Sequence, residues 1–509
     1  RTDDEQNELR LDGVDLDLLS VAIDNRLLTS NEYSVDATSL SIVDLPAQFK
    51  VTIRTRIYPE TNTALEGLYR SSDLYCTQCE AEGFRKITYY PDRPDVQSKF
   101  TTTLLADSDR FSVMLANGNL IRDEITPDGR RSVTWCDPFN KPSYLFALVA
   151  GNLAVLEDNF TTVSGRDVAL RIYADSHNID ACKHAMESLK RAMAWDEIAF
   201  GREYDLDTFM IVAVEDFNMG AMENKGLNIF NTSCVLASPN TATDDAYMRV
   251  EGVVAHEYFH NWSGNRVTCR DWFQLSLKEG FTVFRDSEFS AAMNFRDVKR
   301  IEDVDALRTI QFAEDASPLA HPVRPSSYVE ISNFYTTTIY EKGAEVVRML
   351  SIMLGQDKFR AATDLYFARH DGSAATTEDF VVAMEEVSGL DLNQFRNWYS
   401  QAGTPLIEVT ERHRGNSIEL HLRQTCDPSP NQPAKSAFHI PISIGLVSID
   451  GEDILGQVGA SNGFDIKIQT NLNFENPNGD GTLTFHFDRE EATIRIEGAP
   501  PKAAVSFLR

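Results

Sequence analysis

The stretch His256-Glu257-Tyr258-Phe259-His260 indicates how this 509-residue chain folds, and Glu279 follows it after an interval of eighteen residues, 261–278. Two histidines four positions apart lie on the same face of a helix, about one turn from each other. Their imidazoles can then bind one zinc ion, and the glutamate between them points toward a water on that metal. The alternative is a solvent-facing helix that carries the pattern by chance, and Glu279 as a third ligand argues against it.

The expected ligand set is that of a catalytic metal site. Residues 247–262 have a helical pattern, and Glu279 falls in the next helical segment, 271–290. Two histidines and one glutamate leave the fourth zinc position open to water, whereas a closed structural site needs a fourth protein ligand, and none is obvious. Zinc lowers the pKa of that water, so Glu257 can accept its proton and later pass it to a leaving amine.

A second candidate segment is the loop Gly220-Ala221-Met222-Glu223-Asn224, which follows the strand-like run 208–214. Glycine and alanine let the backbone approach a substrate closely, and the glutamate beyond them can receive an ammonium group. Such a loop is a weak signal by itself. Its position shortly before the histidine motif makes it a strong one.

The charge and hydropathy of the chain argue against two classes of partner. Lys+Arg 48 against Asp+Glu 77 gives a net charge of −29, which repels nucleic acid and anionic lipid. The sequence has no apolar run of about 18 residues or more, so no membrane span is expected. The negative charge can attract cationic substrates such as peptides with a free amine, although an acidic surface that serves only solubility explains it equally well.

The seven cysteines are odd in number and scattered, which favours reduced thiols in the cytoplasm over a disulfide framework. Cys76 and Cys79 form a Cys-x-x-Cys pair, but no second Cys or His pair stands nearby to complete a metal site, so a structural role is expected. The N-terminus lacks the basic and apolar regions of a secretory signal and lacks an initiator methionine, which suggests a processed chain.

The periodicity divides the chain into three parts of an α+β multidomain protein. Residues 1–152 are predicted to form a β-rich N-terminal domain, in which residues 49–57 alternate between apolar and polar. Residues 153–403 mix strands and helices and contain the zinc motif. Residues 404–509 return to short strands and predict a small β-sandwich.

Within the middle part, the run 208–214 predicts a strand. Thr376 and Asp379 predict a capping box at the start of the last helix. The helical patterns cover residues 178–199, 245–263, 271–290, 338–354 and 378–402.

Three motifs, in this order, resemble the zinc aminopeptidase N family, which belongs to the gluzincin group with a thermolysin-like catalytic domain. They are the Gly-Ala-Met-Glu-Asn loop, the His-Glu-x-x-His pattern with its later glutamate, and Tyr340-Glu341-Lys342-Gly343-Ala344-Glu345. The stretches 76–83, 256–262 and 265–272 look closest to the bacterial alanyl aminopeptidase N subgroup. The resemblance runs over essentially the whole chain.

The resemblance implies a zinc-dependent aminopeptidase with one zinc ion per chain and broad specificity for alanine-type, neutral and basic N-terminal residues. It implies that His256, His260 and Glu279 bind the zinc. It also implies that Glu257 is the general base and that Tyr340 donates to the oxyanion of the tetrahedral intermediate. The substrate-binding roles that it implies fall to Glu223 and Glu80 for the free α-ammonium, Gln78 close by, Gly220 and Ala221 for the peptide backbone, and Met219 for the first side-chain pocket.

A purely structural role is the alternative for Tyr340, Met219 and Gln78, and two departures from the family pattern bear on the activity. Cys234 stands where the subgroup usually has a tyrosine, which leaves the substrate preference open. The chain ends at Arg509, just after the small sandwich, where subgroup members continue into a large helical domain. A fragment or short form that keeps the zinc site, with an incomplete first domain, is therefore expected, and its activity alone is open.

Three functions remain to be weighed. The favoured one is a monomeric, cytoplasmic aminopeptidase that acts on peptides with a free N-terminal amine and has no nucleic-acid or membrane partner. The second is a non-catalytic scaffold, which would be expected to lose a ligand, the base or the tyrosine. The third is a related hydrolase that acts on an epoxide, but the loop of that group resembles Gly-Gly-Met-Glu-Asn more than Gly-Ala-Met-Glu-Asn. An endopeptidase is a further variant, and intact Glu223 and Glu80 disfavour it.

Overall fold

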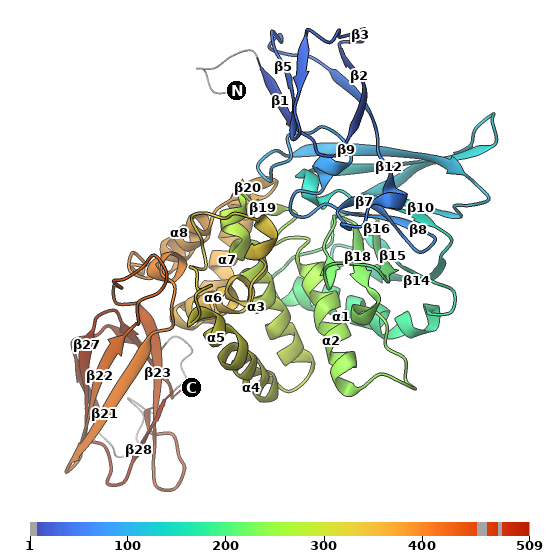
Figure 1. Cartoon of the computed structure of the whole chain (residues 1–509). Helices are drawn as coiled ribbons and strands as arrows, with labels where there is room; N and C mark the ends of the chain where they lie inside the picture. Colours follow the sequence, from blue (N-terminus) through green and yellow to red (C-terminus); the bar gives the residue numbers. More distant parts are fainter. Residues whose placement is uncertain (1–7, 456–465, 477–480, 508–509) are drawn as a thin grey trace. The chain divides into compact units, whose positions relative to one another are not determined.

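The computed structural model describes residues 8–455, 466–476 and 481–507 (Figure 1). These residues form two compact units, and the division falls inside the helix α3, Leu275–Met293. The first unit consists of the residues up to Trp272 together with Arg285–Phe295 and His370–Ala375, and the second of Phe273–Phe284, Arg296–Arg369 and the residues from Thr376 onward.

The first unit begins with four antiparallel sheets within the described residues, as the predicted β-rich N-terminal domain requires. Two of them have the spatial orders β1 (Leu9–Asp12), β5 (Ser39–Ile42), β4 (Tyr33–Val35) and β3 (Arg26–Leu27), β2 (Asp17–Ile23), β6 (Val51–Arg56). A third has four strands in the order β10 (Val113–Ala116), β13 (Leu148–Gly151), β8 (Leu74–Gln78), β7 (Gly67–Ser71). The last has the order β11 (Asn119–Ile125), β12 (Arg130–Lys141), β9 (Ser98–Asp107).

A five-stranded mixed sheet follows, and its edge strand leads into the loop of Glu223. Its order is β14 (Ala154–Thr161), β15 (Asp167–Ala174), β16 (Thr208–Val214), β18 (Leu227–Asn231) and β17 (Ala221–Met222). The three central strands run parallel and the two edges antiparallel. β16 coincides with the predicted strand, and it is buried from its second residue to its last, as a strand covered on both faces should be.

Two helices, α1 (Lys183–Ala199) and α2 (Asp244–Phe259), pack against this sheet (Figure 1). Alternate residues of β15, such as Leu170 and Ile172, join one apolar core with Leu189 of α1 and Val254 of α2. This core holds the histidine-bearing helix on the sheet. A short parallel pair, β19 (Val267–Cys269) and β20 (Ser373–Ala375), completes the unit.

The second unit begins with helices and ends with strands. Its helices are the first part of α3, then α4 (Arg296–Ala306), α5 (Phe312–Asp315), α6 (Gly343–Leu354), α7 (Gln356–His370), α8 (Thr377–Ser388) and α9 (Asn397–Ser400). One-turn π-helices occupy Leu307–Gln311 and Thr338–Lys342. Short 3₁₀ turns occur in both units at Pro59–Thr61, Phe84–Lys86, Ser143–Leu145, Ile179–Cys182, Thr232–Cys234, Trp272–Gln274 and Ile331–Phe334.

The helix predicted over residues 378–402 is two helices. The predicted capping box is present: Thr376 Oγ1 accepts a hydrogen bond from the Asp379 amide, and the Asp379 carboxylate accepts one from the Thr376 amide. Gly389, at φ +77°, ends α8 in the left-handed conformation that glycine adopts without a Cβ penalty. An irregular segment therefore separates α8 from α9.

Among its described residues, the C-terminal part contains two antiparallel four-stranded sheets, in agreement with the predicted β-sandwich. Their orders are β21 (Leu406–Arg414), β22 (Ser417–Thr425), β27 (Glu491–Glu497) and β24 (Lys467–Thr470); and β25 (Phe474–Glu475), β26 (Leu483–Phe487), β23 (Ile440–Val447) and β28 (Ala504–Phe507). Leu420, Ile494, Ile444 and Phe485 are fully buried. The predicted α+β multidomain class is confirmed by this succession of strands, mixed sheet with helices, and strands.

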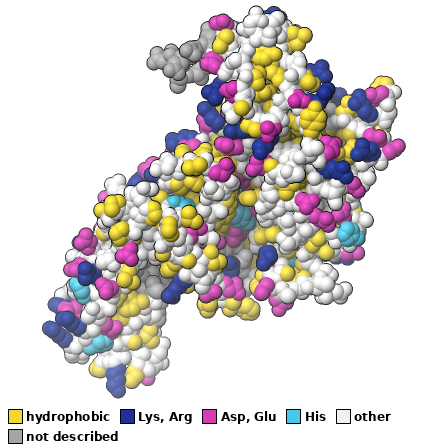
Figure 2. Space-filling model, viewed as in Figure 1, with side chains coloured by type: hydrophobic (Ala, Val, Ile, Leu, Met, Phe, Trp, Pro, Cys, Tyr) yellow, Lys and Arg dark blue, Asp and Glu magenta, His cyan; other side chains and the backbone are white. Residues whose placement is uncertain are grey.

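The acidic side chains are dispersed over the visible face of the molecule (Figure 2). On the face shown in Figure 2, Asp and Glu side chains are spread among Lys and Arg side chains and do not gather in one patch. Among the described helices, none has the length and hydropathy of a bilayer-spanning segment.

Candidate active site

The helix α2 places both histidines at its C-terminal end. Thr243 caps the N-terminus, where its side chain accepts a hydrogen bond from the Ala246 amide, and two aspartates follow in the first turn, where the helix dipole favours them. His256 lies in the last turn and His260 is the C-cap residue, still in a helical conformation. The i, i+4 spacing therefore brings their two Nε2 atoms within 3.0 Å of each other.

The other nitrogen of each ring is held by a hydrogen-bond acceptor. His256 Nδ1 lies 2.6 Å from Asp286 Oδ2, and His260 Nδ1 lies 2.8 Å from the carbonyl oxygen of Ser263. Because a carboxylate and a carbonyl can only accept, both Nδ1 atoms carry a proton, and a neutral ring in this tautomer has its lone pair on Nε2. Both Nε2 atoms then present lone pairs to the same point, an arrangement that suits two ligands of one cation.

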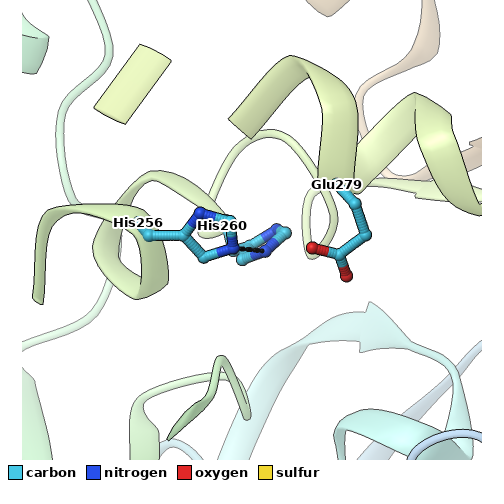
Figure 3. Close-up of side chains that lie close together, drawn as sticks. All are labelled: His256, His260 and Glu279. Atoms are coloured by element: carbon cyan, nitrogen blue, oxygen red, sulfur yellow. Dashed lines mark hydrogen bonds between the residues drawn. The ribbon is translucent and has the colours of Figure 1, made fainter. Parts of the chain in front are cut away.

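Glu279 completes the predicted set of three. The ligand atoms of His256, His260 and Glu279 all lie within 4.8 Å of one another. Figure 3 shows the Glu279 carboxylate pointing toward the two imidazoles. Two imidazole nitrogens and one carboxylate form the donor set of a catalytic zinc site, so the residues present fit the metal that the sequence predicts.

The helix α3 supplies both Glu279 and the carboxylate that orients His256. Glu279 and Asp286 are seven residues apart, which is close to two helical turns, so they share a face. The next residue, Arg285, is fully buried and ties α3 to the end of α2, because it donates to the Phe259 carbonyl and to Ser263 Oγ at 2.8 and 2.7 Å. A cation at this point also complements the C-terminal dipole of α2.

Glu257 follows His256 directly in α2 and is buried at 6% exposure. Its carboxylate, that of Glu223 and the imidazole of His260 form a second group whose ligand atoms lie within 4.8 Å of one another. The predicted base and the predicted ammonium-binding glutamate are therefore neighbours beside the same histidine.

The loop that carries Glu223 is formed at the edge of the five-stranded sheet. β17 pairs antiparallel with β18, with Ala221 opposite Phe230, and the Gly220 carbonyl accepts from the Asn231 amide at 2.9 Å. Ala221 is buried and Gly220 is exposed. The edge strand thus leaves one side of its backbone available for hydrogen bonds to an extended peptide.

Two side chains tie this loop to the segment after the second histidine. Asn265 Nδ2 donates to the Glu223 carbonyl at 2.9 Å, and Lys225 Nζ donates to Asn261 Oδ1 at 2.7 Å. Lys225 is also paired with Asp205, 2.6 Å from its Oδ2. Burial lowers the pKa of Lys225, and although burial alone would raise the pKa of Asp205, its pairing with Lys225 and Arg266 holds that pKa below its ordinary value.

Gln78 and Glu80 reach the same loop from β8 and the residues that follow it. Ligand oxygens of Glu80, Glu223 and Glu279 all lie within 4.8 Å of one another, so the first two carboxylates face one point beside the third predicted zinc ligand. Gln78 is buried, and its Nε2 lies 3.3 Å from the Glu80 carbonyl and 3.8 Å from Met222 Sδ. Gln78 therefore packs between the two segments that carry these carboxylates.

Met219 and Cys234 lie at the outer end of the loop. Met219 is half-buried, directly before Gly220. A Cβ placed on Gly220 would lie 3.6 Å from Cys234 Sγ, so the thiol borders the loop. Burial raises the pKa of the Cys234 thiol, which keeps it neutral near pH 7.

Tyr340 lies in the π-helical turn Thr338–Lys342 of the second unit, and it is half-buried. Hydrogen bonds hold both ends of this turn. Glu314 Oε1 accepts from the Thr338 amide at 2.9 Å, and Lys342 Nζ donates to Asp315 Oδ2 at 2.6 Å. Single π-helical turns occur frequently at functional sites, where they reposition a side chain.

A close helix crossing within the second unit joins the Glu279 and Tyr340 segments. A Cβ on Gly280 would lie 2.7 Å from the carbonyl carbon of Gly343, a distance that real side chains do not reach. The backbones of α3 and α6 therefore meet at two glycines, one next to Glu279 and one three residues after Tyr340.

The residues that sequence reasoning missed are those that hold others in place. Asp286 and Gly280 had a signal, since they lie on the helix of Glu279, one at i+7 and one adjacent to it. Asn265 lies inside a stretch that the sequence singled out, and Lys225 directly follows the loop motif, but no spacing indicates which segment they bind. Their partners become visible only once the loop and the end of α2 are placed together.

The chain was compared with known families and proteins. Residues 5–145 match the peptidase M1 N-terminal domain, 184–399 the peptidase family M1 domain, and 403–509 a domain of unknown function, DUF3458, with an Ig-like fold. Aminopeptidase N of Escherichia coli (strain K12) is 55% identical over 453 residues, which cover 89% of this chain and 52% of that protein. Aminopeptidase N of Caulobacter vibrioides is 60% identical over 409 residues, 80% of this chain and 47% of that protein.

Among solved structures, that of Legionella pneumophila aminopeptidase A in complex with aspartic acid is similar over the whole chain. The TM-score is 0.87 at 35% sequence identity, and the match covers 100% of this chain and 55% of that one. Fold and donor set together are those of a metallopeptidase built around a His-Glu-x-x-His helix.

The chain belongs to peptidase family M1. Within that family it is similar to the bacterial aminopeptidases N, as the three sequence motifs predicted. It spans about half the length of the curated relatives it matches.

Proposed function

We propose that this chain is the metal-binding part of a zinc-dependent aminopeptidase that removes the N-terminal residue from peptides. The observation that carries the proposal is the pair of imidazoles whose Nδ1 atoms are both held by acceptors, with Glu279 as third donor and two carboxylates, Glu80 and Glu223, facing one point nearby. The first group suits a catalytic metal and the second suits an ammonium group.

The hydrolytic step uses Glu257. When bound, zinc supplies a Lewis acid that makes water a nucleophile near neutral pH. Glu257, buried beside His260, accepts the proton of the attacking water and passes it to the leaving amine. The Tyr340 phenol donates a hydrogen bond to the oxyanion. A well-placed donor of this kind stabilises the transition state by ~3 kcal/mol.

The restriction to the first peptide bond follows from Glu80 and Glu223. Two carboxylates attract a free α-ammonium and set its distance from the attacking water, so the first peptide bond is the one that reacts. A blocked amine would forfeit these charge-assisted hydrogen bonds and leave the carboxylates without a partner cation. Gly220 and Ala221 align the peptide backbone along the sheet edge.

Broad specificity follows from Met219. Its flexible thioether, in the first side-chain pocket with Gln78 close by, adapts to side chains of different shape. The seven cysteines are all free thiols, which supports the proposal of a reducing cytoplasm. We propose a monomer that acts on peptides, without a nucleic-acid or membrane partner.

Hydrolysis of an alanyl amide by the 509-residue chain tests the function. The N-acetylated amide and a zinc chelator serve as the two controls. Cleavage of the free amine alone, abolished by the chelator and restored by zinc, is the expected result. Full zinc occupancy without cleavage would instead favour a non-catalytic scaffold, or a site that needs the part of its relatives that this chain does not span.

Glu223→Ala tests the ammonium site separately. The variant is expected to raise KM for free-amine substrates by about tenfold or more, because a charge-assisted hydrogen bond is lost, while its zinc content stays that of the wild type. Zinc content is measured by metal analysis after dialysis. A parallel loss of zinc would assign Glu223 a structural role.

A further inference from the structure

A cavity of about 200 Å³ in the first unit is lined by none of the candidate zinc ligands and is rich in cationic side chains. Lys99, Lys141, Lys225 and Arg266 line it, together with Asp371. Such a group is unusual in a chain whose net charge is −29. A water takes about 30 Å³ of liquid volume, so the cavity has room for a small ion and a few waters.

The carboxylates around the cavity do not balance its cations. Asp205 forms ion pairs with both Lys225 and Arg266. Asp371 pairs with Arg266 at 2.7 Å, and Asp137 lies 3.1 Å from Lys141. Four cations thus meet three carboxylates, and one positive charge is in excess. An anion in the cavity would neutralise it.

Lys141 is the cation with donors to spare. It is 1% exposed, and its Nζ makes no hydrogen bond among the described residues, although it lies near Asp137 and 4.0 Å above the Phe100 ring. Burial lowers the pKa of Lys141 to about 8, against the opposing effect of Asp137. Although Asp137 balances its charge, the buried ammonium keeps protons that no aligned acceptor uses, and a bound oxygen ligand could accept from them.

The other buried lysine, Lys225, adds positive charge to the cavity but has no proton left to donate to a bound ion. Lys225 Nζ already donates to both oxygens of Asp205 and to Asn261, which uses its three protons. Lys99 is exposed at the rim and is available to an ion that enters.

Asn265 adds an acceptor to the same cavity. Its Nδ2 donates to the Glu223 carbonyl, whereas its Oδ1 is buried and has no hydrogen-bond partner among the described residues. The cavity therefore presents one unused buried donor, on Lys141, and one unused buried acceptor. A fully deprotonated anion could satisfy only the donor.

We propose that this cavity binds a small protonated oxyanion of the phosphate class, to which Lys141 donates and whose hydroxyl donates to Asn265 Oδ1. Inorganic phosphate keeps a hydroxyl at neutral pH and meets both requirements, whereas sulfate has no proton to give and chloride has neither group. Lys99 closes the cavity from the solvent side as a second donor.

Isothermal titration calorimetry of phosphate into the zinc-loaded chain tests the proposal. Sulfate and chloride, at the same ionic strength of about 0.15 M, serve as comparison anions because salt screens exposed charges at that level. Saturable binding of phosphate, with sulfate at least fivefold weaker and chloride without effect, is expected. Equal binding of phosphate and sulfate would overturn the assignment of a protonated oxyanion.

The double variant Lys141→Met, Asp137→Asn locates the site. It removes the unused donor without leaving a buried carboxylate alone, and it leaves the zinc ligands intact, so phosphate on the zinc would still be detected. Binding to the cavity should weaken at least tenfold. Unchanged phosphate binding would overturn the proposal.

Lys99→Met is the second variant, because an exposed side chain can change without loss of folding. It should weaken phosphate binding about threefold, and Lys183→Met, at another exposed lysine, on α1, is the matched control. Equal effects of these two variants would reduce the cavity to general surface electrostatics and overturn the assignment.

Discussion

Glu257 is the residue at which metal binding and catalysis can be separated, because it lies beside His260 without being one of the three donors. Glu257→Gln keeps the shape of the side chain and removes its basicity. We expect full zinc occupancy and a loss of alanyl amide hydrolysis of about 10²–10⁴-fold, the usual contribution of a general base. Zinc analysis and kcat are measured on the same preparation.

Glu251→Gln is the matched control, since Glu251 lies on the same helix, is buried, and pairs with Arg191 and Asn294, neither of which is a candidate site residue. It should retain kcat within a few-fold. A Glu257→Gln variant with wild-type turnover would show that another group takes the proton.

Asp286 acts on the metal through His256. Asp286→Ala removes the acceptor that holds the Nδ1 proton and the ring orientation, so zinc affinity should fall about 10–100-fold. Competition with a chromogenic chelator measures it. Asp286→Asn keeps one oxygen acceptor and should lose less; equal losses for the two variants would mean that the carboxylate charge, and not the hydrogen bond, is what matters.

At the scale of elements, the crossing of α3 with α6 brings two helix backbones close together at Gly280 and Gly343, next to Glu279 and three residues after Tyr340. Gly280→Ala places a methyl group 2.7 Å from backbone, so either helix must move. We expect a loss of about 1–3 kcal/mol in unfolding free energy from overpacking, and a fall in kcat because the Glu279 and Tyr340 segments shift.

Gly252→Ala on α2 is the matched control. A Cβ there meets nothing closer than Ser290 Oγ at 3.7 Å, so alanine should fit and stabilise the helix by up to about 1 kcal/mol. Thermal unfolding and kcat of both variants are compared. A Gly280→Ala variant with unchanged kcat would show that the crossing does not set the position of Tyr340.

The elements that could be predicted are those encoded locally. The buried strand β16 and the capping box of α8 follow from runs and pairs of neighbouring residues, and both were placed correctly. The π-helical turn at Tyr340 was predicted as ordinary helix, because its extra residue is set by Glu314 and Asp315, which approach from elsewhere in the chain.

The candidate site divides in the same way. The spacing within the motif predicts that His256 and His260 face one point, and the structure shows it. Asp286, by contrast, acquires its role only when α3 packs beside α2, a tertiary contact that no local spacing encodes. The roles of the predicted substrate-binding residues stay predictions.

At the scale of the whole molecule, buried histidines make stability depend on pH. His439 in the C-terminal sandwich is buried, and its Nε2 lies 3.0 Å from His486 Nδ1. Burial first, and then His486, lowers the pKa of His439 from 6.5 to about 4, against the opposing effects of Asp488 and Asp391. Glu475 lies 3.3 Å from the far nitrogen of His486.

The sign of the effect follows from that lowered pKa. The unfolded chain binds the proton of His439 more readily than the folded chain, so this contribution is complete above about pH 6.5 and is lost as the pH falls through about 4. The free energy of unfolding falls by on the order of 3 kcal/mol over this pH range. In urea unfolding, the free energy of unfolding of His439→Gln should fall less between pH 6.5 and about 4 than that of the wild type. His413→Gln, at an exposed histidine of the same sandwich, should follow the wild type; identical slopes for all three proteins would rule out His439 as the titrating group.

The continuity of α3 limits which sequence lengths the site tolerates. Because Glu279 and the partner of His256 are carried by one uninterrupted helix, inserting a single residue between them would rotate one relative to the other by about 100° and shift it by about 1.5 Å. Substitutions on the outer face of α3 leave that alignment intact, whereas insertions and deletions between 279 and 286 do not. The helix fixes the spacing between residues 279 and 286, so variation in this stretch should consist of substitutions.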